Sequence, residues 1–162
     1  MKALVDLHDR LAGLATASAD WLLPSLARLA FAAVLLAYFW ASALTKFDGV
    51  LTPSLGGYAQ IFPRAFEAVG YDASQMGLWP RLVVLAGAYA EFLLPALIVA
   101  GLFTRQAALG MVGFVLVQSL TDIAGHGASP GAWFDRASDS LILDQRTLWM
   151  LLLVVLITKG AG

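Results

Sequence analysis

One almost uninterrupted apolar segment, Leu82 to Phe103, constrains the fold of this chain more than any other feature. As an α-helix, its 22 residues would extend about 33 Å, enough to cross the hydrocarbon core of a bilayer, which is about 30 Å thick. The segment contains a single carboxylate, Glu91, near its middle. A charge at that depth costs about 2.5 to 3.5 kcal/mol on insertion scales, so it marks a functional or packing site. We therefore expect the rest of the chain to surround Glu91.

The composition is that of an integral membrane protein. Of its residues, 60% are hydrophobic and 13% are charged, whereas soluble domains carry about 25% charged residues. The net charge of −1 provides no basic field for binding nucleic acid. The chain has no cysteine, and its two histidines, His8 and His126, lie far apart in the sequence. We therefore expect no disulfide, metal or iron–sulfur centre, and no resident cofactor, with a quinone as the one possible exception.

The pattern predicts one all-α membrane domain over residues 1–162, a bundle of four transmembrane helices. An N-terminal amphipathic segment, 1–21, is expected to lie at the membrane surface or against the bundle, with partner docking as the alternative. The long first loop, 47–80, is rich in Gly, Pro and aromatic residues and is expected to form an interfacial lid. The predicted spans are 24–45, 82–103, 107–121 and 145–159, with Pro24 in the first turn of the first span and Asp144 as the N-cap of the last.

Two basic residues, Arg28 and Lys46, bracket the first span. They are separated by 18 residues, five helical turns, and therefore project from the same face. Basic residues at span ends commonly serve as anchors that extend to the interface, but the shared face indicates that these two also point into the bundle. Ser42 adds a hydroxyl to the same part of the helix.

The surroundings of Glu91 contain a helix defect and a polar neighbour. Pro95, four residues later, cannot donate to the carbonyl of Glu91, which predicts a kink. Gln118 in the third span lies at a similar depth, so it either meets Glu91 or bonds water near the span end. Arg81 and Arg105 are 10 and 14 residues away, about 15 and 21 Å. Another helix must therefore supply a partner for Glu91, or the carboxyl group stays protonated.

The most specific pattern in the chain is a glutamate followed by an apolar stretch and a Gly-Leu-x-Thr-Arg turn. The pattern as a whole consists of Arg28, Thr45-Lys46-Phe47, Ala90-Glu91, Leu97 to Leu102, Thr104-Arg105, Ala107 to Leu109 and the final Lys159-Gly160-Ala161-Gly162. It resembles the DoxX family of small four-helix bacterial inner-membrane proteins. The resemblance implies that Arg28, Lys46, Glu91 and Arg105 are the matching polar positions. It also implies an association with redox or stress-response proteins, since the family name comes from a subunit linked to thiosulfate:quinone oxidoreduction.

Two functions follow as expectations. The first is a non-catalytic accessory or scaffold subunit of a membrane-associated redox or stress-response system, with membrane or soluble protein partners. The alternative is binding or transport of a small amphiphilic ligand, quinone-like or a small solute, in a pocket around Glu91, Gln118, Lys46, Arg28, Arg105 and Ser42. Direct enzymatic chemistry is the least expected, because the side chains provide no electron carrier. Lys and Arg residues divide five to five between the two sides, and we expect both termini in the cytoplasm, with the long loops outside the inner membrane.

Overall fold

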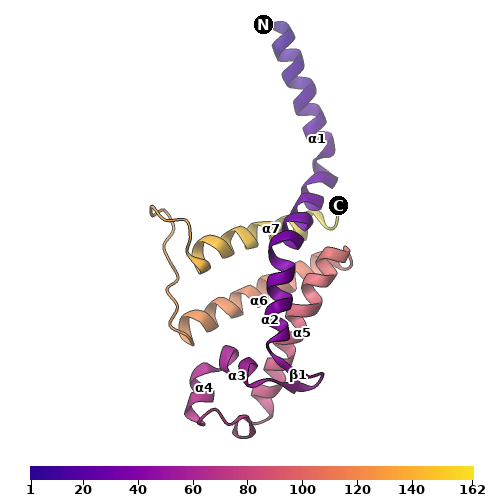
Figure 1. Cartoon of the computed structure of the whole chain (residues 1–162). Coiled ribbons are helices and arrows are strands. Elements are labelled where there is room, and N and C mark those ends of the chain that lie inside the picture. The colour runs from indigo at the N-terminus through magenta and orange to yellow at the C-terminus, as the bar shows by residue number, and fades with distance from the viewer.

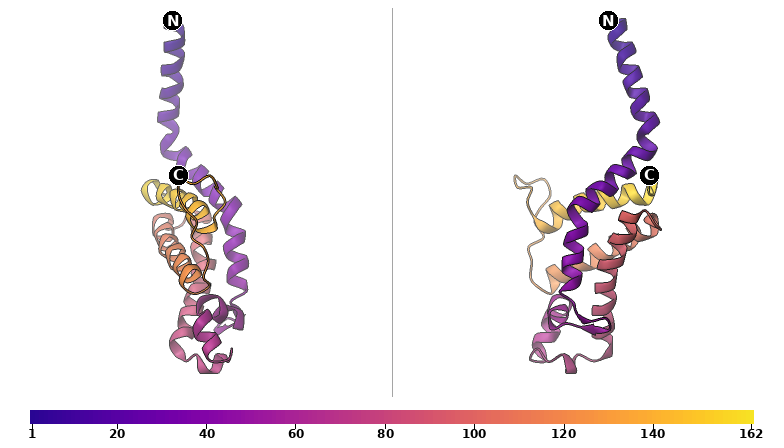
Figure 2. Two further views of the ribbon diagram at one scale, coloured as in Figure 1. Left: turned by 90° about the vertical axis from the view of Figure 1, so that its left-hand side faces the viewer. Right: turned by 45° about the vertical axis from the view of Figure 1, so that its right-hand side comes forward.

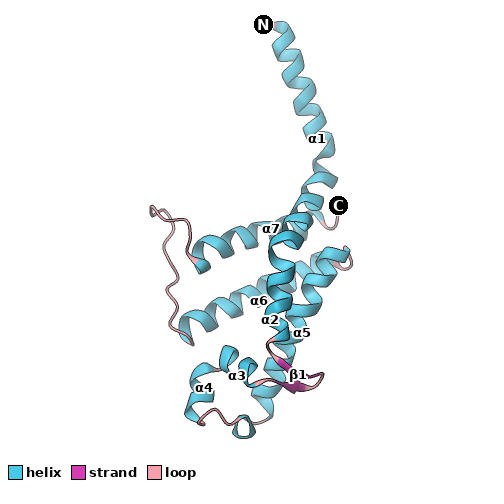
Figure 3. Cartoon of the chain, viewed as in Figure 1, coloured by secondary structure: helices cyan, strands magenta, loops and turns pink.

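The computed structural model describes all 162 residues and shows an almost entirely helical chain (Figures 1 and 3). Four helices are long and apolar enough to cross a membrane, as the sequence predicts. The elements in order are α1 (Lys2–Phe31), the π-helical η1 (Ala32–Leu36), α2 (Ala37–Leu44), β1 (Phe47–Gly49), β2 (Thr52–Pro53), α3 (Leu55–Ile61), α4 (Pro63–Ala68), the 3₁₀ turn η2 (Ala73–Gln75), α5 (Leu78–Ala100), α6 (Thr104–Ala124), the π-helical η3 (Leu141–Gln145) and α7 (Arg146–Lys159).

The four spans pack around one apolar core. Helix α5 lies against α2 and α6, and α7 lies against α6 and α1 (Figures 1 and 2). The core is built from aromatic and aliphatic side chains that are essentially inaccessible to solvent, including Phe31, Leu35, Phe39, Ile98, Met111, Val115, Leu153 and Leu156. Many other large apolar side chains of the spans are exposed on the outside of the bundle, as expected for helices that face lipid tails.

The first span differs from the prediction at its N-terminus. α1 is continuous from Lys2, so Pro24 is buried inside the helix and is not in its first turn. A proline at this position removes one helical hydrogen bond and favours a bend, and α1 bends before it enters the bundle (Figure 2). Residues 2–17 are exposed and extend away from the other helices. The N-terminal segment therefore does not lie against the bundle.

The last span begins four residues before the predicted boundary. Ser140 is the N-cap, and its Oγ accepts a hydrogen bond from the Asp144 backbone N–H at 3.1 Å. Asp144, the predicted cap, lies in the first turn, and its carboxylate accepts from the Ser140 N–H at 2.9 Å. This reciprocal pairing resembles a capping box. The span covers Leu141–Lys159, 19 residues, or about 28 Å, instead of the about 22 Å expected.

Residues 47–80 fold into a lid at one end of the bundle (Figure 3). The lid contains the β1–β2 hairpin, which the sequence analysis did not predict, and the helices α3 and α4. Tyr58, Phe66 and Met76 pack with Val84 of α5 to form a second, smaller core. The η2 turn is capped by Asp72, and donors from Gln75 and Ser74 hold the pKa of this carboxyl group below its usual value.

Gly57 permits the lid to approach the bundle closely. A Cβ atom at Gly57 would lie 2.7 Å from Val84 Cγ1 and 3.3 Å from the Lys46 Cα. Any larger residue would therefore push α3 away from α5 and from the end of α2. The lid is thus fixed directly over Lys46.

Candidate functional site

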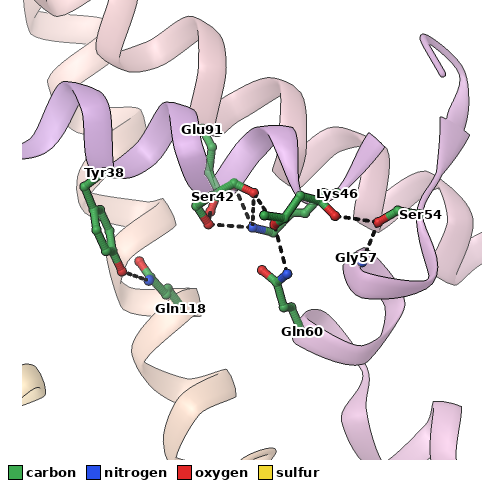
Figure 4. A network of polar contacts seen from close by, with 9 residues as sticks. Tyr38, Ser42, Lys46, Ser54, Gly57, Gln60, Glu91 and Gln118 are labelled. Atoms are coloured by element: carbon green, nitrogen blue, oxygen red, sulfur yellow. Dashed lines mark hydrogen bonds and ion pairs between the residues drawn. The ribbon is translucent and has the colours of Figure 1, made fainter. Parts of the chain in front are cut away.

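The intramembrane carboxylate of Glu91 is paired with a lysine from the first span (Figure 4). Lys46 Nζ donates to Glu91 Oε2 at 2.8 Å, and both residues are buried, with exposures of 4% and 2%. Ser42 Oγ donates to Glu91 Oε1 at 3.1 Å and accepts from Lys46 Nζ at 2.7 Å. Lys46 therefore does not extend to the interface as an anchor. The partner that Glu91 needs from another helix is Lys46.

The end of α2 and the lid hold this pair in place. Ser42 and Lys46 are one helical turn apart, so their side chains lie on the same face. Ser54, the N-cap of α3, donates to the Thr45 carbonyl at 2.6 Å and accepts from the Gly57 N–H at 2.9 Å. The Ser54 N–H donates to the Lys46 carbonyl at 2.9 Å. The lid thus satisfies the free carbonyl groups at the helix end that carries Lys46.

Helix α5 continues through Pro95. Pro95 has no N–H to donate to the carbonyl of Glu91. The next carbonyl along the chain, that of Phe92, accepts a hydrogen bond from Trp40 Nε1 at 3.0 Å. The indole ring of Trp40 also stacks on the phenyl ring of Phe92, with centroids 5.0 Å apart. α2 therefore contacts α5 near Glu91 through both backbone and side-chain groups.

A second ion pair, with a buried arginine and a partly exposed aspartate, lies between α6 and α7. Arg146, with 3% exposure, donates through Nη2 to Asp122 Oδ2 and through Nη1 to Ser119 Oγ, the latter at 2.7 Å. The sequence analysis did not identify Arg146, Asp122 or Ser119 as site residues. The sequence does contain one indication that Asp122 belongs to the site, because Gln118 and Asp122 are four residues apart and share a face of the third span. The earlier start of the last span then places Arg146 inside the bundle.

The two ion pairs line one cavity of about 660 Å³. Its walls on α5 and α6 include small residues such as Ala86, Gly87, Ala90 and Gly113. Gln118 also lines the cavity, but its Nε2 donates to Tyr38 Oη at 3.1 Å and not to Glu91. The polar and charged residues around the cavity are Ser42, Lys46, Gln60, Glu91, Gln118, Thr121, Asp122, His126 and Arg146, with Tyr38.

The remaining two predicted residues lie at the opposite end of the spans. Arg28 donates to the carbonyls of Val99 and Ala161, both at 2.8 Å. Arg105 donates to the Thr158 carbonyl at 3.4 Å. The structure therefore brings Ser42, Lys46, Glu91 and Gln118 to the cavity, and it places Arg28 and Arg105 at the C-terminal ends of α5 and α7.

The cavity combines balanced charges with apolar walls. Its two buried cations each have a carboxylate partner, and Ile61, Val83, Leu94, Phe114 and Val117 supply apolar surface. Apolar pockets with a few convergent polar groups are the usual sites for small organic ligands. No group of three or more His, Cys, Asp or Glu residues lies close enough to hold a metal ion.

Comparison with known proteins gives one match. A family model described as DoxX matches residues 23–121, more than half of the chain. The matched region includes Ser42, Lys46, Glu91 and Gln118, whereas the free N-terminal half of α1 and all of α7, with Arg146, lie outside it. No curated protein and no solved structure matches the chain.

Proposed function

Because the chain belongs to the DoxX family of membrane proteins, we propose that this member binds a small amphiphilic ligand in the cavity around Glu91. The observation that carries the proposal is the cavity of about 660 Å³, which is lined by the Lys46–Glu91 and Arg146–Asp122 ion pairs. Buried ion pairs contribute little net stability compared with apolar packing. A chain that needed only a stable bundle would gain more from filling this space with side chains. A quinone-like molecule or another small solute is of suitable size and polarity.

The test fills the cavity without disturbing the helices. A Cβ atom at Gly113 would contact nothing within 4 Å, although Gly113 lines the cavity. Gly113→Leu therefore adds a side chain where there is space, and it replaces a poor helix former with a good one. Leu116→Phe is the matched control, since Leu116 is an exposed residue of the same helix and does not line the cavity.

The measurement is mass spectrometry of organic extracts from the purified proteins. We expect a small molecule at near-stoichiometric amounts in wild type and in Leu116→Phe, and at least tenfold less of it in Gly113→Leu. Equal amounts in all three proteins, or none in wild type, would contradict ligand binding in the cavity.

The second candidate function is that of a non-catalytic accessory subunit, and the exposed part of α1 favours it. Leu4, Leu7, Leu11 and Leu14 are 53 to 71% exposed and follow the three- and four-residue spacing of a coiled-coil seam. Residues 1–20 contain two basic and three acidic side chains, so they provide no basic patch for anionic lipid. We propose that a helix of a redox or stress-response protein with a matching apolar stripe packs on this seam.

Affinity purification in mild detergent tests the second candidate. A partner protein should be recovered in fixed proportion with wild type, and it should be lost in the double variant Leu7→Lys/Leu11→Lys. Asp6→Lys/Asp9→Lys, on another face of the same helix, is the control and should retain the partner. A protein that elutes alone from native membranes would contradict the accessory role.

We also propose that the chain lies in the inner membrane with both termini in the cytoplasm. Because the Lys and Arg residues divide evenly between the two sides, their distribution does not decide the orientation. The chain has no native cysteine, so single introduced cysteines can be labelled to determine it. Ser18→Cys on the N-terminal helix should be protected from a membrane-impermeant thiol reagent in intact cells, whereas Ser138→Cys in the loop before α7 should react. The reverse labelling pattern would show that both termini lie on the outer side of the membrane.

A further inference from the structure

The tip of the β1–β2 hairpin exposes two apolar side chains. Val50 and Leu51 connect the two strands and are 76% and 67% exposed. The hairpin lies beside α5 and protrudes from the lid (Figures 1 and 3). Two-residue hairpin loops favour Gly, Asn and Asp, which suit both the turn and water. The turn itself therefore does not explain why Val and Leu stand at this tip.

Helix α5 holds the tip through its two carbonyl groups. Tyr89 Oη donates to the Val50 carbonyl at 2.6 Å, and Arg81 Nη2 donates to the Leu51 carbonyl at 2.9 Å. The Phe47 ring packs edge-on against the Tyr89 ring, with centroids 5.1 Å apart. A carbonyl group at an exposed turn can usually bond to water, whereas a carbonyl group in lipid needs a donor from the protein. Both acceptors of the tip have such a donor.

The N–H groups of the tip differ from its carbonyl groups. Neither the Val50 nor the Leu51 N–H donates to another group of the protein. The tip therefore needs acceptors from its surroundings, but no donors. Water supplies both kinds of group, and the acyl chains of lipid supply neither. The ester groups between the acyl chains and the headgroups of a phospholipid supply carbonyl acceptors without N–H or O–H donors, which matches the tip.

The residues around the tip are typical of the membrane interface. Aromatic and basic side chains concentrate at this level, and the tip lies between Arg81 and Tyr89, since it bonds to both. Trp79, at the start of α5, is 71% exposed. Asp48, two residues before Val50, is also exposed, and its carboxylate would be costly among acyl chains. Insertion of the hairpin must therefore be shallow.

We propose that this tip is a lipid contact site. The Val50 and Leu51 side chains lie among the first acyl-chain segments of the leaflet on the lid side, and their N–H groups donate to phospholipid ester carbonyls. A protein partner fits less well, because specific interfaces involve about 20 to 30 residues on each side. The contact also stabilises the lid over the ion pair, because the hairpin leaves the chain after Lys46 and returns to it where the Ser54 N–H donates to the Lys46 carbonyl.

Spin labels on single introduced cysteines test the location, because the chain has no native cysteine. The full chain carrying labelled Leu51→Cys is placed in phospholipid nanodiscs, and its relaxation by oxygen, which enters lipid, is compared with that by a water-soluble nickel complex. Leu93→Cys, exposed on α5, is the lipid reference, and Ser138→Cys in the loop before α7 is the water reference.

The oxygen-to-nickel ratio at Leu51 should exceed that at Ser138 at least about threefold, because a polar complex is excluded from the acyl chains. It should also lie below the ratio at Leu93, because insertion is shallow. A ratio equal to that at Ser138 would overturn the inference and place the tip in water. Low access to both reagents would also overturn it, since the tip would then be covered by protein.

A second variant tests the donor from Tyr89. Tyr89→Phe leaves the Val50 carbonyl without a donor, and the ester layer offers no replacement. The hairpin should therefore loosen, and the label at Leu51 should become about twofold more mobile. Tyr71→Phe, at an exposed tyrosine of the same lid that packs on Phe66, is the control and should change nothing. Unchanged mobility in folded Tyr89→Phe would mean that water replaces the lost donor, which would contradict the lipid location.

Discussion

The two ends of the bundle use basic residues in different ways. At the lid end, Lys46 and Arg146 are paired with carboxylates from other helices, and both pairs line a cavity. At the opposite end, Arg28 and Arg105 donate only to backbone carbonyls. α5 and α6 are joined by a short turn at the second end, whereas the cavity lies between them towards the lid.

The end of the bundle opposite the lid, which carries Arg28 and Arg105, is a structural cap. Gly101 ends α5 in the left-handed conformation, with φ of 76°, and the Leu102 N–H donates to the Leu97 carbonyl at 3.0 Å, the pattern of a Schellman motif. A Cβ atom at Gly101 would lie 3.0 Å from Arg28 Nη2. The Gly-Leu-x-Thr-Arg segment therefore forms a helix turn against which Arg28 packs. A basic side chain at the C-terminal end of a helix also favours the helix dipole.

The largest expected effect comes from breaking the Lys46–Glu91 pair. Glu91→Leu should lower the free energy of unfolding by about 3 to 5 kcal/mol, because it leaves a buried ammonium group without a counter-charge. The double variant Lys46→Met/Glu91→Leu removes both charges and should recover most of this loss. Unfolding in mixed micelles measures both values. If the double variant were as unstable as Glu91→Leu, the pairing would not be the source of the loss.

The pairing also shows how far the sequence analysis could reach. It predicted the four spans, because length and hydropathy decide them, and it predicted that Glu91 either has a partner from another helix or stays protonated. It did not identify Lys46 as that partner, since a lysine at a span end usually reaches the interface. The choice depends on the lid, which covers Lys46 through Ser54 and Gly57. Loop packing of this kind leaves no periodic pattern in the sequence.

Arg146 was missed for a related reason. The apolar pattern alone started the last span near Asp144, which placed Arg146 at its entrance. The η3 turn begins the span at Leu141, capped by Ser140, and moves Arg146 one turn deeper. Leu141 to Leu143 are apolar, but Asp144, Gln145 and Arg146 separate them from the apolar run of α7. The reciprocal Ser140–Asp144 pairing shows that the whole segment is helical.

The second largest effect should come from the Arg146–Asp122 pair. Asp122→Leu should cost about 2 to 3 kcal/mol, less than Glu91→Leu, because the Asp122 side chain is 26% exposed and water can reach this pair. Ser119→Ala, which removes only one hydrogen bond to Arg146, should cost about 1 kcal/mol. The same unfolding measurement ranks the three variants. A loss for Asp122→Leu equal to that for Glu91→Leu would mean that the two pairs are equally closed to water.

Arg28 should affect stability but not ligand binding. Arg28→Met removes two charged hydrogen bonds to carbonyls and should lower the free energy of unfolding by about 2 kcal/mol. Arg28→Lys, which can keep one of them, should lose less. Neither variant should change the amount of small molecule that co-purifies, since Arg28 lies outside the cavity. Loss of the small molecule from a folded Arg28 variant would show that the end opposite the lid also contributes to ligand binding.

The smallest effect should come from Arg105. Its hydrogen bond to Thr158 is long, at 3.4 Å, and the residue is exposed, so its contribution is mainly the interaction of a charge with the C-terminal end of α7. Arg105→Gln should therefore cost about 0.3 to 1 kcal/mol at low ionic strength, and less in high salt, because salt screens exposed charges. Arg28→Met should show little dependence on salt, since the guanidinium of Arg28 is half-buried. A salt-independent loss above about 1 kcal/mol for Arg105→Gln would mean that this arginine is also a packed element of the cap.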